Sequence, residues 1–93
     1  MNNTDVLNFI ETPEFKDFLD NYTFGLPATI GLISNVLKIL MQKNINIINV
    51  MKELKTYMEF KKNIIIESDN PSYKAYEEIR EFLVGKILEN ITF

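Results

Sequence analysis

Three prolines divide the chain at places where a helix can begin, and this constrains the fold more than any other feature of the sequence. Pro13 follows Thr12 and Pro71 follows Asn70, so each proline takes the first helical position after a residue that caps helices well. Pro27 comes directly after a Gly-Leu pair, which provides a break and a new start. Because a proline has no N–H to donate and the first helical turn needs none, we expect a helix to start at each proline.

Between these starts, apolar residues recur every three or four positions, which is the period of an amphipathic helix. Helices are predicted over 4–11 (a short segment), 13–22, 27–43, 46–62 and 71–90. Residues 63–69 contain three consecutive isoleucines and fit either a continued helix or an extended piece. The expected fold class is all-α, with residues 1–93 forming a single domain, an antiparallel bundle of four to five helices joined by short connections.

The segment 27–43 is the most apolar of the predicted helices, since hydrophobic residues cover more than half of its circumference. A helix with so broad an apolar surface is mostly buried, so we expect it at the centre of the bundle.

The last predicted helix has two sides of different chemistry. Its expected buried side is Tyr73, Tyr76, Ile79, Leu83, Val84, Ile87, Leu88 and Ile91. Its expected outer side is Lys74, Glu77, Glu78, Glu81 and Glu89.

The composition excludes several kinds of chemistry. The 93 residues include no Cys, no His and no Trp, so disulfides, thiol nucleophiles, imidazole bases and Cys/His metal sites are ruled out. The three glycines are scattered and form no phosphate-binding loop. Paired carboxylates lie on polar helix faces, where solvation opposes the pKa shift that acid–base catalysis needs. We expect a non-enzymatic protein that uses no cofactor and no metal.

Charge and hydropathy indicate a cytoplasmic protein. The net charge is -3, which is the wrong sign for a general nucleic-acid binder. The chain begins without a basic, apolar leader, and its most apolar stretch is interrupted by Pro27, Asn35 and Lys38, so we expect no membrane segment. The abundance of Ile, Asn and Lys is typical of an A/T-rich genome, which together with the small size suggests a regulator or inhibitor encoded by a phage or another mobile element.

Misplaced hydrophobic residues give the main functional hypothesis. Phe82 falls among charged residues on the last helix, with Ile79 at the border and Lys86 and Phe93 near the same side. Phe60 lies off the apolar stripe of the 46–62 helix. Clustered exposed aromatic residues often mark an interface, although a neighbouring helix of the same chain could also cover them. We therefore expect a protein-binding module that uses this apolar surface to contact another protein or a second copy of itself.

A DNA-binding regulator is the alternative. Residues 36–54 resemble the first two helices of a winged helix-turn-helix domain, because a short turn joins an apolar helix to a second helix that starts at once. The resemblance implies DNA as the partner, with phosphate contacts from the lysines of the second helix. These candidate nucleic-acid-binding residues are Lys52, Lys55, Lys61 and Lys62.

Overall fold

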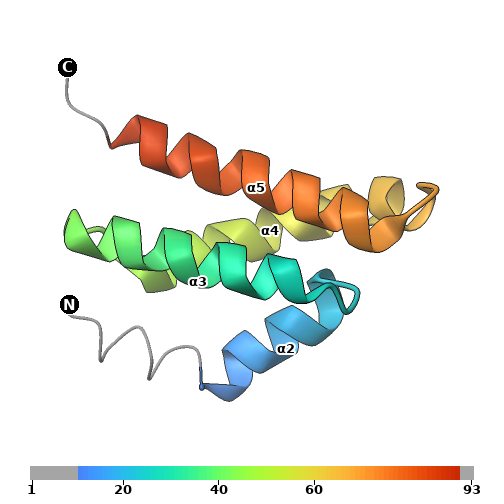
Figure 1. Cartoon of the computed structure of the whole chain (residues 1–93), viewed down its shortest axis with the longest axis horizontal. Coiled ribbons are helices and arrows are strands. Elements are labelled where there is room, and N and C mark those ends of the chain that lie inside the picture. Colours follow the sequence, from blue (N-terminus) through green and yellow to red (C-terminus); the bar gives the residue numbers. More distant parts are fainter. Residues whose placement is uncertain (1–10, 91–93) are drawn as a thin grey trace.

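The regular elements of residues 11–90, which are the residues that this computed structural model describes, are all helices. They are α2 (Pro13–Tyr22), α3 (Pro27–Gln42), α4 (Ile47–Ile66) and α5 (Pro71–Glu89). Figure 1 shows that successive helices alternate in direction along the chain. The all-α prediction is confirmed. The short helix expected over 4–11 lies almost entirely outside the described residues.

Local chemistry explains where the helices begin. The side-chain oxygens of Thr12, Asn46 and Asn70 each accept hydrogen bonds from backbone N–H groups in the first turn of the following helix, at 3.0–3.3 Å. These bonds satisfy donors that have no partner within the helix. Gly25 and Asn44 adopt left-handed backbone conformations, with φ of 80° and 62°, in the connections before α3 and α4. Glycine and asparagine are the residues that tolerate this conformation best.

The segment 63–69, for which the sequence left two possibilities open, continues α4 as a helix through Ile66. Because successive residues of a helix point about 100° apart around its axis, the three isoleucines point in different directions. Ile65 is 1% exposed and joins the core, whereas Ile64 and Ile66 are about half exposed. The apolar run therefore supplies one core side chain and leaves two on the surface.

One hydrophobic core lies between the four helices. Its fully enclosed members, all with an exposed fraction below 2%, include Phe15, Ile33, Leu37, Leu40, Ile47, Leu54, Met58, Ile65, Ile79 and Leu83. The radius of gyration of 13.0 Å is that of a compact domain of this length.

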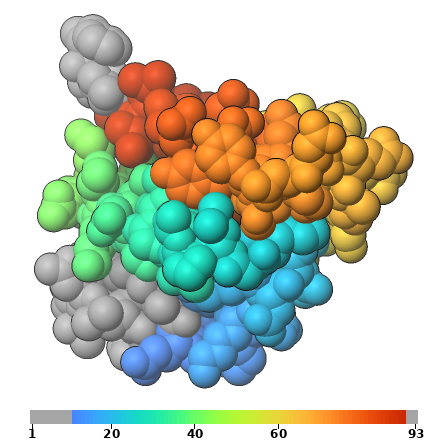
Figure 2. Space-filling model, turned by 45° about the vertical axis from the view of Figure 1, so that its right-hand side comes forward, coloured from blue at the N-terminus to red at the C-terminus, as the bar shows by residue number. Residues whose placement is uncertain are grey.

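Helix α5 makes the most extensive helix–helix contacts, because it packs on both α3 and α4, which contact each other less. Figure 2 shows the surface of α5 lying directly against that of α3. Helix α2 makes few close backbone contacts and is held by the buried rings of Phe15, Phe18 and Tyr22. The central position expected for the 27–43 helix is not confirmed.

The predicted buried side of α5 is wrong in part. Tyr73, Val84 and Leu88 are 43–57% exposed, although their spacing placed them inside. Glu78 is 6% exposed, although its charge placed it outside. The positions of α3 and α4 determine which arc of α5 is covered, and that arc is centred on the row formed by Ala75, Ile79 and Leu83 and takes in Glu78.

Candidate functional site

The apolar patch predicted on α5 does not form as one exposed surface. Ile79 is fully buried in the core. Phe82 is half-buried and packs against the core. Lys86 forms ion pairs with Glu53 of α4 and Glu89. Phe93 lies outside the described residues. The expected docking patch around Ile79 and Phe82 is therefore corrected, because the neighbouring helices cover this part of α5. Ile79 lies on the buried side of α5, where its spacing also placed it.

Aromatic and charged groups close the seam between α4 and α5 around Phe82. Its ring lies 5.2 Å from the ring of Tyr57, centre to centre. The Nζ atom of Lys86 lies 5.5 Å from the centre of the Phe82 ring, within the range of a cation–π contact. Phe82 thus fixes α5 against α4, which is the covering by a neighbouring helix that the sequence left open as one possibility.

A buried carboxylate lies beside these rings. Glu78 accepts a hydrogen bond of 2.5 Å from the hydroxyl of Tyr57. Its carboxylate oxygens also lie 3.3 Å from the ammonium group of Lys74 and 3.8 Å from that of Lys61. Burial alone would raise the pKa of Glu78, but the Tyr57 hydrogen bond and the two lysines lower the pKa below its usual value. The buried carboxylate therefore has a hydrogen-bond donor and two positive charges beside it, which is typical of a structural role. Lys61 is one of these partners.

An exposed apolar surface is present on the outer side of α4. Phe60 is 80% exposed, and Ile64, four residues later on the same side of the helix, is 53% exposed. We call these two residues the Phe60 surface. The sequence placed Phe60 outside the apolar stripe, as the structure has it. It missed Ile64, whose position could be assigned only once the helix was known to continue past residue 62.

The candidate DNA-contacting lysines do not all lie free on one face. Lys52, Lys55 and Lys62 are exposed, and within residues 11–90 none of the three is in an ion pair. Lys61 is paired with Glu78 and also lies over the ring of Tyr57, at 5.7 Å.

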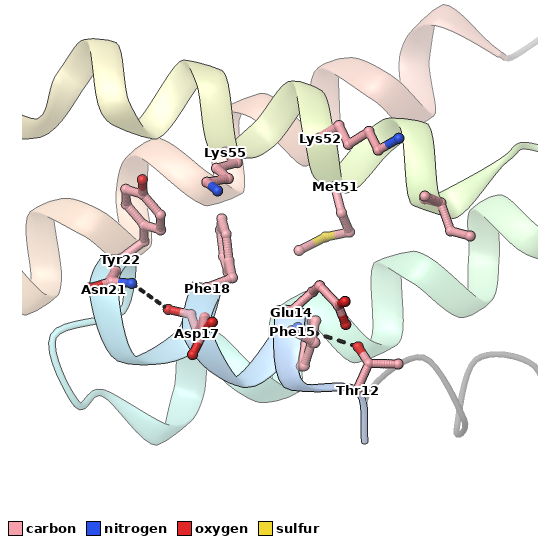
Figure 3. A pocket seen from close by; sticks show the side chains of 11 residues that line it. Thr12, Glu14, Phe15, Asp17, Phe18, Asn21, Tyr22, Met51, Lys52 and Lys55 are labelled. Carbon is pink, nitrogen blue, oxygen red and sulfur yellow. Dashed lines mark hydrogen bonds between the residues drawn. The ribbon is translucent and has the colours of Figure 1, made fainter.

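A cleft of about 540 Å³ lies between α2 and α4 (Figure 3). Its residues are Thr12, Glu14, Phe15, Asp17, Phe18, Asn21, Tyr22, Ile48, Met51, Lys52 and Lys55. In Figure 3, Glu14 and Asp17 project from α2 on one wall, and Lys52 and Lys55 from α4 on the other. The sequence analysis missed this cleft, because no residue spacing showed that α2 would lie along the lysine-bearing side of α4.

A hydrogen bond across one end of the cleft ties its two walls together. The hydroxyl of Tyr22 on α2 donates to Oε1 of Glu59 on α4, at 2.8 Å. Burial, with the hydrogen bond and charge of Glu59, raises the pKa of Tyr22 to about 12. Tyr22 is therefore a neutral donor at physiological pH, and this bond helps to fix the width of the cleft.

Within 11–90, no three carboxylates gather as a metal ion would require. The acidic side chains of the cleft, Glu14 and Asp17, are solvent-exposed. Among the described helices, none has the length and apolar character needed to cross a bilayer.

Comparison with known protein families, with curated proteins and with solved structures finds no match for this chain.

Proposed function

We propose that this chain is a non-enzymatic protein-binding module that works as a regulator or inhibitor, with the Phe60 surface as its contact region and self-association as its first interaction. The observation that carries the proposal is the 80% exposure of Phe60, next to Ile64 on the same side of α4. Two large apolar side chains one helical turn apart form the kind of ridge that helices use to bind partners.

The free energy of covering this surface favours a weak association. Complete burial of a Phe or Ile side chain contributes about 1.5–3 kcal/mol, and both residues of the surface already lie partly against the helix. A symmetric dimer covers the surface twice, because a two-fold axis brings the same residues of both copies together. Association costs at least about 4 kcal/mol in lost translational and rotational freedom, so we expect a weak, reversible dimer that forms at about millimolar concentration.

Measuring mass against concentration tests the proposal. Light scattering of wild type from 10 µM to 1 mM (a range that ends at about the affinity expected here) should show a mass that rises above 10.9 kDa toward twice that value. Phe60→Asp should remain a monomer throughout. Ile39→Asp is the matched control, since it places the same charge at an exposed apolar residue outside the Phe60 surface, on α3. A wild type that stays monomeric at 1 mM, or a Phe60→Asp variant that dimerises as wild type does, would count against the proposal.

DNA binding is the second candidate, supported by three exposed lysines on α4 that have no ion pair within the described residues. Two observations weaken it. Glu14 and Asp17 line the same cleft as Lys52 and Lys55, so the positive potential of the two lysines is offset there. Lys61 forms an ion pair with Glu78, so its charge is already partly neutralised. Duplex binding that weakens steeply with salt and is lost in a Lys52→Ala, Lys55→Ala double variant would favour DNA over the protein-binding proposal.

A further inference from the structure

The cleft between α2 and α4 has a different construction from the Phe60 surface. Its floor is formed by the buried side chains of Phe15, Phe18 and Met51, each at most 6% exposed. Ile48 is 45% exposed and extends the apolar lining toward solvent. A hydrophobic groove is a surface into which an amphipathic helix of a partner can lay its apolar face.

Two short rows of opposite charge border this apolar floor. Glu14 and Asp17 are three residues apart on α2, and Lys52 and Lys55 are three residues apart on α4. Each row therefore spans about 4.5 Å along its helix. None of the four side chains forms an ion pair within residues 11–90, so both rows are available. In Figure 3 the rows lie on opposite sides of the cleft.

We propose that this cleft binds an amphipathic helix of another protein, with an apolar ridge flanked by basic residues on the edge facing α2 and acidic residues on the edge facing α4. Charges three or four residues apart on each edge of such a helix match the 4.5 Å rows on the walls. Flanking charges of this kind select partners in the same way at the edges of coiled coils. A uniformly basic or uniformly acidic helix meets repulsion on one wall.

The test uses three synthetic helical peptides with one leucine ridge and different edges: one edge Lys and the other Glu, both edges Lys, or both edges Glu. Binding to the full chain is followed by fluorescence anisotropy of the labelled peptide at low salt. The mixed-edge peptide should bind about tenfold more tightly than either uniform peptide, and the advantage should shrink as salt is added. Equal binding of all three peptides, or no binding of any, would refute the proposal.

Reversing one wall at a time should change the preference in a defined way. A Lys52→Glu, Lys55→Glu double variant has two acidic walls and should prefer the peptide with two Lys edges. A Glu14→Lys, Asp17→Lys double variant has two basic walls and should prefer the peptide with two Glu edges. All four positions are exposed, so circular dichroism should show the wild-type helical content in both variants. An unchanged preference in either folded variant contradicts the assignment of the walls.

The Phe60→Asp variant separates this site from the Phe60 surface, because it should bind the mixed-edge peptide as wild type does. If Phe60→Asp abolishes peptide binding, the peptide lies on the Phe60 surface and the cleft proposal is wrong. If a wall reversal instead converts a dimer into a monomer, a second copy occupies the cleft, and the proposal of a helix from another protein is equally wrong.

Discussion

Removal of the Tyr57 hydroxyl offers a sharp test of the seam between α4 and α5. The Tyr57→Phe change keeps the ring beside Phe82 and deletes only the donor to the buried carboxylate of Glu78, 2.5 Å away. A hydrogen bond to a charged group contributes about 1.5–3 kcal/mol. Glu78 still has Lys74 at 3.3 Å and Lys61 at 3.8 Å, so its charge is not left alone. We therefore expect a loss near the lower end, about 1.5–2 kcal/mol.

Urea unfolding followed by circular dichroism measures this loss, with Tyr73→Phe as the control. Tyr73 is 56% exposed, and within the described residues its hydroxyl has no hydrogen bond, so its loss should change stability by less than about 0.5 kcal/mol. If Tyr57→Phe is no more destabilising than Tyr73→Phe, the carboxylate of Glu78 does not depend on this bond and the description of the seam is wrong.

The stability contributed by the contact between Tyr57 and Glu78 should depend on pH, and the lowered pKa of Glu78 gives the direction of that dependence. The folded pKa of Glu78 lies below its usual value of 4.5, so the stability that its charged form contributes is present above pH 4.5 and is lost as pH falls through the folded pKa. The difference between wild type and Tyr57→Phe should therefore be largest at neutral pH and shrink on acidification. A difference that grows as pH falls below 4.5 would contradict the assigned ionisation.

Three further stability predictions follow from individual contacts, each measured by urea unfolding. Asn46→Ala removes the cap whose oxygen accepts two backbone N–H bonds at the start of α4 and should cost about 1 kcal/mol, whereas Ala at the exposed Asn49 should cost little. Thr29→Val removes a hydroxyl that is fully buried and has no hydrogen-bond partner within residues 11–90, so it should stabilise the fold by about 1 kcal/mol; a loss of stability would mean that the hydroxyl is satisfied. Lys86→Gln should cost at most about 1 kcal/mol at pH 7. The hydrogen bond with Glu53, offset in part by burial, raises the pKa of Lys86 above 10.5, so this cost should disappear as pH rises through that higher value.

The sequence predicted where helices start more reliably than which sides they bury. Thr12, Asn46 and Asn70 are all caps, because capping and the preference of proline for the first turn are local effects. The end of α4 could not be assigned, since three consecutive isoleucines are compatible with a helix and with an extended segment.

The buried side of α5 could not be predicted for a different physical reason. The burial of Glu78 is supported by Tyr57 and Lys61 on another helix, which supply a donor and a positive charge in addition to Lys74 of α5 itself. Val84 and Leu88 are exposed because no other described helix covers that side of α5, although their spacing matches a core stripe. Both features depend on tertiary placement, and the periodicity of one helix contains no information about it.

The candidate sites also differ in whether they depend on one helix alone or on the packing of two helices. The sequence indicated that Phe60 lies off the apolar stripe of its helix, because both the stripe and the exception lie within one helix. The cleft needs α2 to lie beside α4, and the bond between Tyr22 and Glu59 that ties the two helices joins residues 37 positions apart. Such pairs become visible only when the fold is known.

Amide chemical shifts recorded by NMR during dilution test the central claim most directly. For a chain labelled with ¹⁵N, we predict that dilution from 1 mM, which is about the affinity expected for this dimer, to 20 µM shifts the amides of Phe60 and Ile64 and leaves those of Lys52 and Lys55 in place. Shifts confined to another surface, or none at Phe60 and Ile64 over this range, would contradict the claim that this side of α4 is where the protein binds its own copy.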